Sequence, residues 1–362
     1  MIYLDYQATT PLAPEALDAM LPLLRDNFAN PHSAHAPGRA AKAAVEAARD
    51  RVSALLPAGG QLSFTSGATE AINWAIKAAP PGDIITLATE HAAVLDTADA
   101  LRASGRSVTV LPVRADGIVD LDAARAAIVP GVSLVAAMLV NNEIGVLQPI
   151  AALAAHAHSA GALMLCDVVQ GYGRIAIPAC CDLIAISAHK IHGPKGVGAL
   201  WVRDGLSLAP LLHGGGQEVG GRSGTLSPAL CAGFGAAARL AHDRVTVDGA
   251  HSRALFDLAC QSLGEGWHVN GSVIDRYAGN LNVRRDGLNV AQLMSDLRDI
   301  AFSAGSACAS GSGRPSHVLT ALGLTDAQAK ASIRLGFGRY TSQEELVTAI
   351  DRINAAARVQ GL

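Results

Sequence analysis

The segment Leu183-Ile184-Ala185-Ile186-Ser187-Ala188-His189-Lys190 decides the fold, and the turn Ile191-His192-Gly193-Pro194-Lys195-Gly196 follows it directly. A short, unbroken apolar run is typical of a parallel strand that is buried on both faces of a sheet. In open α/β sheets, ligands bind beyond the carboxyl ends of such strands. Lys190 comes at such an end, so its amine is either a solvated charge or a functional group.

A second apolar segment, Leu163-Met164-Leu165-Cys166-Asp167, also ends on a charged side chain, and Gln170 follows it. A lysine and an aspartate at the ends of two strands form the minimal constellation for pyridoxal phosphate. The lysine makes the Schiff base, and the aspartate partners the pyridinium nitrogen. The pairing of Lys190 with Asp167 therefore favours the functional amine.

Strands and helices alternate from Gln61 onward. Apolar runs predict strands at residues 62–65, 83–88, 107–111, 133–140, 163–167 and 183–187, with helices near 69–79, 92–103, 121–128 and 151–160. This alternation predicts an α/β fold with a mostly parallel sheet flanked by helices. Residues 198–202 follow Lys190 too closely for a helical crossover, so we expect a seventh strand that returns antiparallel.

The part of the chain beyond the sheet has a different pattern. It contains a glycine-rich connector, a long helix, a strand-like segment, a Gly/Ser-rich loop around Cys308 and a closing helix, at residues 213–225, 227–263, 279–284, 303–313 and 344–358. We expect a large cofactor-binding domain over residues 14–250. A smaller α+β domain, made of residues 1–13 and 251–362, would carry the Cys308 loop.

Composition excludes several classes of protein. Hydrophobic residues make up 50% of the chain, charged residues 16%, and the net charge is −3. No Lys/Arg block appears, so we expect no nucleic-acid partner, and no apolar run or N-terminal pattern predicts a membrane span or signal peptide. The six cysteines form no C-x-x-C pair, and the pairs His156/His158 and His189/His192 lack partners at metal spacing. We therefore expect free thiols in a cytoplasmic protein without a metal site.

Three polar motifs follow predicted strands, and each has two interpretations. Residues 65–70, Thr-Ser-Gly-Ala-Thr-Glu, form a strand-to-helix junction that either binds a phosphate at the helix N-terminus or is an ordinary cap. His91 either stacks on a planar cofactor and carries protons, or caps a helix. Asn141 and Asn142 either orient a ligand or form a polar turn.

Two further residues are candidates for chemistry on the substrate. Cys308 is surrounded by small residues, so its thiol is either a reactive nucleophile or incidental. Arg334, in Ser332-Ile333-Arg334-Leu335, alternates with apolar neighbours. It is suited to a bidentate clamp on a carboxylate, or to a structural ion pair.

Taken in order, these motifs resemble those of the cysteine desulfurases of the class V aminotransferase group, which are fold type I pyridoxal phosphate enzymes. The resemblance runs nearly end to end and is carried by residues 3–11, 30–31, 64–70, 91–95, 140–145, 167–170, 187–196, 214–218, 222–225, 306–308 and 332–334. It implies a mostly parallel seven-stranded sheet with a smaller α+β domain.

The resemblance also implies a role for each candidate. Lys190 would be the Schiff-base lysine, with Lys195 as the competing candidate, while Asp167 would hold the ring nitrogen protonated and Gln170 would contact the phenolic oxygen. His91 would stack on the ring and move protons. The remaining cofactor contacts would come from Ala68, Thr69, Asn142, Ser187 and His189, and from Thr225 of the other subunit of a homodimer. The substrate carboxylate would be held by Asn142 and Arg334.

The implied reaction is the desulfuration of L-cysteine. The Cys308 thiolate would attack the substrate sulfur, leaving a persulfide on Cys308 and releasing L-alanine. The sulfur would pass to an acceptor protein, a scaffold or a sulfurtransferase, for iron–sulfur cluster assembly or thio-modification. Because the chain ends at Leu362, soon after the 344–358 helix, we expect scaffold docking to differ from that of relatives with a longer tail.

Other functions stay open at this point. A selenocysteine lyase or a cysteine sulfinate desulfinase of the same family would share the motifs, and rates on the three substrates distinguish them. A plain aminotransferase would not need Cys308 and would give a 2-oxo acid. A non-enzymatic sulfur carrier or scaffold would show no cofactor absorbance.

Overall fold

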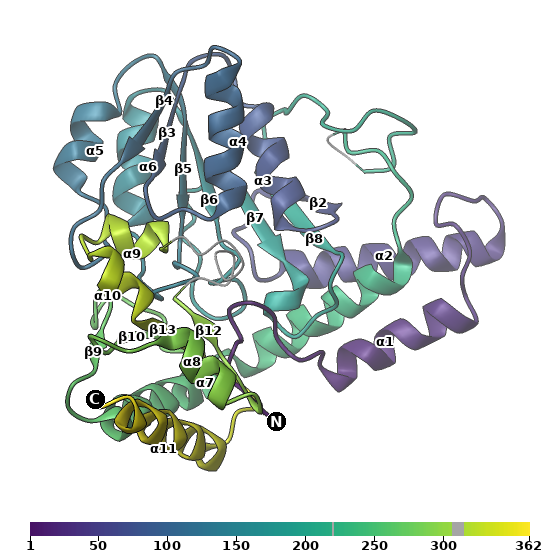
Figure 1. Ribbon diagram of the computed structural model, residues 1–362. Coiled ribbons are helices and arrows are strands. Elements are labelled where there is room, and N and C mark those ends of the chain that lie inside the picture. The colour runs from purple at the N-terminus through teal and green to yellow at the C-terminus, as the bar shows by residue number, and fades with distance from the viewer. Residues whose placement is uncertain (219–220, 306–314) are drawn as a thin grey trace.

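Seven strands form the central sheet, in the order β2-β8-β7-β6-β5-β3-β4 (Figure 1). The computed structural model describes residues 1–218, 221–305 and 315–362. The strands are β2 (Gly60–Thr65), β3 (Asp83–Leu87), β4 (Val108–Leu111), β5 (Val132–Met138), β6 (Leu163–Asp167), β7 (Leu183–Ser187) and β8 (Gly198–Arg203). Neighbours from β4 to β7 pair in parallel, whereas β8 is antiparallel to both β7 and β2. The predicted mostly parallel sheet and the antiparallel return of residues 198–202 are confirmed.

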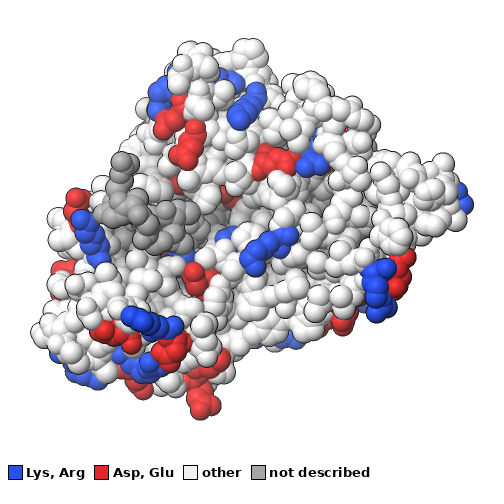
Figure 2. Space-filling view, turned by 45° about the vertical axis from the view of Figure 1, so that its right-hand side comes forward, with Lys and Arg blue, Asp and Glu red and all other residues white. Residues whose placement is uncertain are grey.

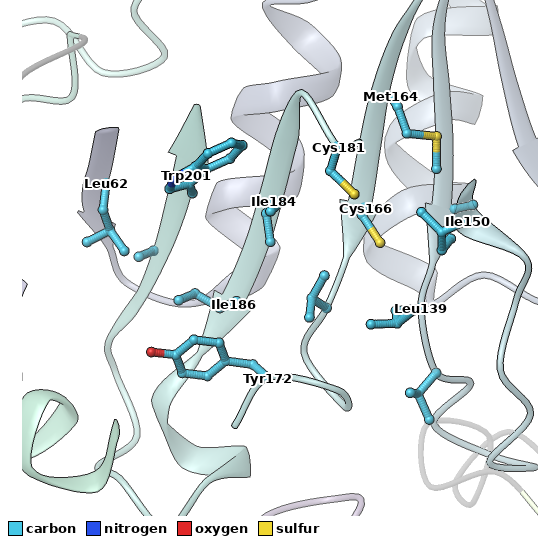
Figure 3. Packing of buried hydrophobic residues seen from close by; sticks show 14 of the residues in the cluster. Leu62, Leu139, Ile150, Met164, Cys166, Tyr172, Cys181, Ile184, Ile186 and Trp201 are labelled. Atoms are coloured by element: carbon cyan, nitrogen blue, oxygen red, sulfur yellow. The ribbon is translucent and has the colours of Figure 1, made fainter. Parts of the chain in front are cut away.

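Strand β7 is buried on both faces, as its unbroken apolar run predicts. Leu183 and Ala185 belong to one hydrophobic cluster, with residues of α3 (Ala68–Lys77) and α4 (Ala92–Ala103). Ile184 and Ile186 belong to another, together with Cys166 and Trp201 on the neighbouring strands (Figure 3). That second face is covered by α1 (Pro14–Arg25), α2 (Ala36–Ser53), α5 (Leu121–Ala127), α6 (Ile150–Ser159) and the first half of α7 (Pro228–Leu263).

A second, antiparallel sheet has the strand order β12-β13-β10-β9. Its strands are β9 (His268–Val269), β10 (Asn280–Arg284), β12 (Ser303–Ala304) and β13 (Ser332–Gly336), accompanied by α8 (Val290–Asp296), α9 (His317–Ala321), α10 (Asp326–Lys330) and α11 (Gln343–Val359). The N-terminal strand β1 (Ile2–Tyr3) pairs with β11 (Ile300–Ala301), so the start of the chain lies with this second part of the molecule (Figure 1).

Helix α7 links the two parts of the molecule. Phe234, near its start, packs into the core of the large sheet, whereas Leu255 and Phe256 pack into a separate core with Leu4 and the second sheet. These two cores are consistent with a large domain of residues 14–250 and a small domain of residues 1–13 and 251–362, a division that we keep as a proposal. The boundary near residue 250 falls inside a continuous helix.

The surface carries charges of both signs. Figure 2 shows acidic and basic side chains intermingled on the face it displays, without a broad area of either sign. Across the described parts of the chain, no helix has the length and apolar character needed to cross a membrane. In those same parts, no three His, Cys, Asp or Glu side chains gather in a way that could hold a metal ion.

Candidate active site

A cavity of about 500 Å³ opens at the carboxyl ends of β2, β5, β6 and β7. The predicted site residues that line it are Ala68, Thr69, His91, Asn142, Asp167, Gln170, Ser187, His189, Lys190 and Arg334. Of the remaining predicted residues, one lies away from the cavity and one cannot be placed. Thr225 is exposed elsewhere, and Cys308 belongs to residues 306–314, which lie outside the described parts of the chain. Residues far apart in sequence thus converge where the end of a parallel sheet offers a ligand site.

Lys190 projects into the cavity from the turn after β7. Its Nζ donates hydrogen bonds to the backbone carbonyls of Gln7 and Ala8, the second at 2.7 Å. Burial, aided by the positive charges of Arg334 and Arg174, lowers the pKa of the Lys190 amine to about 8. About a tenth of the amine is therefore neutral at pH 7, and this is the form that can attack an aldehyde.

Asp167 is the last residue of β6, and its side chain is buried. One carboxylate oxygen accepts a hydrogen bond from the Val169 N–H at 2.9 Å. Burial raises the pKa of the Asp167 carboxyl, and the hydrogen bond from the Val169 N–H and the nearby Lys190 amine oppose that rise. A buried carboxylate in this position is stabilised by a cationic partner, so the site favours a ligand that brings a positive charge here.

His91 caps a helix, one of the two roles that the sequence left open, and its position also leaves the other role possible. Its Nδ1 accepts a hydrogen bond from the Ala93 N–H at 3.0 Å and caps helix α4, and the residue also lines the cavity. Because Nδ1 is the acceptor, a neutral ring carries its proton on Nε2. Burial lowers the pKa of the His91 imidazole, which favours this neutral form.

The N-terminus of α3 lies at the cavity and offers hydrogen-bond donors to a ligand. Its N-cap residue is Gly67, which provides no side-chain cap, so the first backbone N–H groups are available to a ligand. Gly198 lies against this turn, because a Cβ at that position would come within 2.7 Å of Gly67 backbone atoms. The hydroxyl-bearing residues Thr69 and Ser187 complete this part of the lining. A phosphate group fits these donors.

The cavity lining also includes two polar side chains that are neutral at pH 7, those of His189 and Gln170. His189 pairs through Nδ1 with the Thr9 hydroxyl at 3.1 Å, and burial lowers the pKa of its imidazole to about 4. Gln170 is buried, and its Nε2 donates to the carbonyl of Gln7 at 3.0 Å. Both therefore act by hydrogen bonding without adding charge at neutral pH.

Arg334 lies in β13, and its side chain is only 1% exposed. Its Nη2 donates to Asp5 at 2.7 Å and to the Ser303 hydroxyl at 3.2 Å, and its Nη1 donates to the carbonyl of Asn142 at 3.0 Å. The structural ion pair that the sequence left open is thus present. Within the described residues, Nε has no hydrogen-bond partner although it is buried, so one donor of the guanidinium stays available.

The N-terminal arm is the part of the site that sequence reasoning missed. Gln7 and Ala8 accept hydrogen bonds from Lys190 although they lie 183 and 182 residues away in the chain. Asp5 binds Arg334 across 329 residues. The only signal in the sequence was a run of polar residues in an extended arm. A local pattern cannot identify contacts between residues so far apart in the chain.

Comparisons with known proteins bear directly on this site. Residues 2–348 match the family model described as aminotransferase class-V. The chain is 42% identical over 368 residues to the cysteine desulfurase IscS of Rickettsia felis, covering 97% of this chain and 90% of that protein. The solved structure of a NifS-like protein from Rickettsia africae superposes with a TM-score of 0.91 at 30% identity over 99% of both chains. A structure described as SspA in complex with cysteine gives a TM-score of 0.83 at 33% identity, covering 94% of this chain and 100% of the other.

The chain therefore belongs to the class-V aminotransferase family, with the fold type I architecture. Within that family it belongs with the cysteine desulfurases, which depend on pyridoxal phosphate. The predicted family, fold type and cofactor are confirmed.

The cavity residues fit pyridoxal phosphate by the chemistry of their donors. The uncapped N-terminus of α3 would hold the phosphate, and the buried carboxylate of Asp167 would hold the ring nitrogen. Lys190 supplies an amine of lowered pKa for the aldehyde, and the flat ring of His91 lines the same space.

Proposed function

We propose that this protein removes the sulfur atom from L-cysteine, releases L-alanine and leaves the sulfur as a persulfide on Cys308. The observation that carries the proposal is the convergence of Lys190, Asp167 and His91 on one cavity, in a chain with full-length similarity to cysteine desulfurases. The overall step balances without an oxidant. The carbon–sulfur bond of the substrate breaks, and a sulfur–sulfur bond forms on Cys308. Of the two thiol protons, one ends on the methyl group of alanine and the other on the persulfide, so the carbon is reduced as the two sulfur atoms are oxidised.

Lys190 and His91 would divide the proton transfers. When bound, pyridoxal phosphate supplies the electron sink that stabilises negative charge at the substrate Cα. The Lys190 amine, with a pKa of about 8, can accept and return a proton near neutral pH. His91 presents its Nε2, because its Nδ1 is committed to the Ala93 N–H.

Arg334 and Asn142 would orient the substrate carboxylate. The buried Nε of Arg334 lacks a partner among the described residues, and Asn142 lines the cavity next to it through the Arg334–Asn142 hydrogen bond. An anionic carboxylate would satisfy that donor and offset the buried positive charge. Asp5 already neutralises part of the Arg334 charge. Arg334 would therefore orient a substrate carboxylate by hydrogen bonding more than attract it by charge.

The decisive experiment incubates the cofactor-loaded protein with L-cysteine. We expect alanine and sulfide in equal amounts in the presence of a reductant. Without reductant, peptide mass spectrometry should find one extra sulfur atom on the peptide that contains Cys308. Pyruvate or another 2-oxo acid as the main product would instead support a plain aminotransferase.

Substrate choice within the family is tested by parallel rates. L-selenocysteine and L-cysteine sulfinate need no thiolate attack of the same kind, so a selenocysteine lyase or a sulfinate desulfinase would not depend on Cys308 in the same way. We expect L-cysteine to be the substrate that loses most activity in a Cys308→Ala variant. A purified protein that binds no pyridoxal phosphate would instead support the non-enzymatic alternative, a sulfur carrier or scaffold.

Cofactor loading gives a pH-dependent prediction. The neutral form of Lys190 is the nucleophile, so the rate at which the cofactor-free protein binds pyridoxal phosphate covalently should rise about tenfold per pH unit below the pKa and level off above pH 8. Stopped-flow absorbance measures this rate. An ordinary lysine, with a pKa of about 10.4, would keep gaining rate up to roughly pH 10, and that profile would contradict the assignment.

We further propose a homodimer in which Thr225 completes the phosphate site of the partner subunit. Thr225 is exposed on the glycine-rich connector, where a second subunit can reach it. Helix α1 and the residues after it also expose a row of large apolar side chains, Leu17, Leu21, Leu24 and Phe28, at 43%, 47%, 58% and 81% exposure. Sedimentation velocity should find a dimer, and Thr225→Ala should weaken cofactor binding several-fold. A monomer at micromolar concentration would refute this arrangement.

The sulfur acceptor is proposed to be a protein, either a scaffold or a sulfurtransferase, because a persulfide on Cys308 is transferred by attack of another thiol. The cytoplasm remains the predicted location. It suits the cysteines that the structure describes, all of which carry free thiols. Transfer of labelled sulfur to a candidate acceptor, with Cys308→Ala as the control, tests the first point, and cell fractionation tests the second.

A further inference from the structure

Arg174 is not part of the cavity lining but contacts two residues that are, Gln170 and Lys190. Its Nη2 donates a hydrogen bond to the backbone carbonyl of Lys190, and its Nη1 donates to the side-chain oxygen Oε1 of Gln170 at 3.1 Å and to the Gln170 carbonyl at 3.2 Å. The guanidinium carbon lies 5.1 Å from the centre of the Tyr277 ring, a cation–π contact. One side chain thus joins the ends of β6 and β7.

The Arg174 contact determines which end of the Gln170 amide faces the cavity. A guanidinium has donors only, so it selects the oxygen of the amide. The nitrogen Nε2 is then directed to the other side, where one of its two N–H groups donates to the carbonyl of Gln7 at 3.0 Å. Because Gln170 lines the cavity, the group that it can offer to an acceptor there is the second N–H.

Arg174 also places a permanent positive charge near the Lys190 amine. The other charged groups that act on this amine are Arg334 from β13, Asp5 from the N-terminal arm and Asp167 from β6, and the two arginines together oppose the two carboxylates. His91 and His189 also interact with Lys190, but the pKa of each imidazole is lowered, so neither adds a charge at neutral pH. Arg174 is therefore one of two fixed cations that favour a neutral nitrogen at this place.

We propose that Arg174 is a positioning residue that holds Gln170 as a hydrogen-bond donor toward the cofactor and disfavours protonation of the nitrogen contributed by Lys190. This proposal rests on the roles proposed above for Lys190 and Gln170. A lysine at position 174 would keep the charge but could not reach both carbonyl groups with one planar fork. Comparing Lys and Gln at position 174 therefore separates the effect of orientation from the effect of charge.

The test uses the cofactor-loaded protein and two readouts other than activity. The first is the pH titration of the visible absorbance of the lysine-bound cofactor, and the second is the dissociation constant for pyridoxal phosphate. In Arg174→Gln, the titration midpoint should rise by about one pH unit, because a nearby cation is lost and protonation becomes easier. In Arg174→Lys, the midpoint should stay near that of the unchanged protein, while cofactor binding weakens several-fold.

Arg203→Gln is the matched control. Arg203 is also partly buried and also donates to a backbone carbonyl, that of Cys181 at 3.0 Å, but it lies at the opposite end of the sheet. This variant should leave both readouts unchanged. If Arg174→Gln fails to fold, Arg174→Lys still tests the orientation, because unchanged cofactor affinity in that variant would overturn it.

Failure of this inference and failure of the proposed site are distinguishable. Borohydride reduction followed by peptide mass spectrometry of the unchanged protein shows whether the cofactor is attached to Lys190. Attachment elsewhere overturns the proposed site and this inference with it. Attachment to Lys190, combined with Arg174 variants that titrate and bind like the unchanged protein, overturns the role of Arg174 alone.

Discussion

Replacing Lys190 with alanine is expected to lower alanine formation from L-cysteine by about 10³-fold or more. The variant loses both the amine that would hold the cofactor and the base that would move the Cα proton. The carbonyls of Gln7 and Ala8 hold the Lys190 Nζ at the end of β7. No other described side chain makes both of these contacts. The purified variant should also lack the absorbance of lysine-bound cofactor.

Lys195 provides the matched control. It lines the same cavity but is exposed, in the turn beyond β7 that made it the competing candidate in the sequence. Lys195→Ala should retain the covalent attachment and most of the activity, with at most a several-fold change in cofactor affinity. If Lys195→Ala abolished the attachment and Lys190→Ala did not, the two assignments would have to be exchanged.

Replacing Cys308 with alanine should separate cofactor binding from sulfur transfer. The variant should keep the absorbance of lysine-bound cofactor and its response to L-cysteine, because none of the described groups in the cavity is changed. Formation of alanine and sulfide should fall on the order of 10³-fold or more, because the sulfur atom has lost its acceptor nucleophile. Cys308 lies outside the described residues, so this prediction rests on the sequence motif alone.

Cys180→Ala is the control for a general effect of removing a thiol. Cys180 is partly exposed, and burial together with the adjacent Cys181 raises the pKa of its thiol, which makes it a poor nucleophile. This variant should react at the rate of the unchanged protein. Desulfuration that survives in Cys308→Ala but is lost in Cys180→Ala would transfer the nucleophile role to a different cysteine.

Local sequence patterns predicted the scaffold of the site well. The strand at residues 183–187 and its abrupt end at Lys190 follow from the unbroken apolar run, because a strand buried on both faces needs apolar residues at every position. Asp167 at the end of β6 follows in the same way, and parallel pairing brings the two ends to the same edge of the sheet. The position of these groups is therefore a consequence of short-range pattern and fold topology.

Other features of the site depend on contacts between distant segments. Sequence patterns gave two interpretations each for His91 and Arg334, and the structure has His91 both capping a helix and lining the cavity, and Arg334 both paired with Asp5 and lining the cavity. Neither outcome is encoded in the spacing of neighbouring residues. It depends on how the small sheet and the N-terminal arm pack against the end of the large sheet.

The sequence alone determined the succession of strands and helices along the chain, the family and the candidate residues for the chemistry, because periodicity and motif are properties of neighbouring positions. Only the tertiary structure decided the protonation and orientation of those residues. The lowered pKa of Lys190, the orientation of the Gln170 amide by Arg174 and the closure of the cavity by Gln7 and Ala8 all arise from burial and hydrogen bonds between separate segments. Desolvation and hydrogen-bond direction depend on three-dimensional surroundings, which no local pattern specifies.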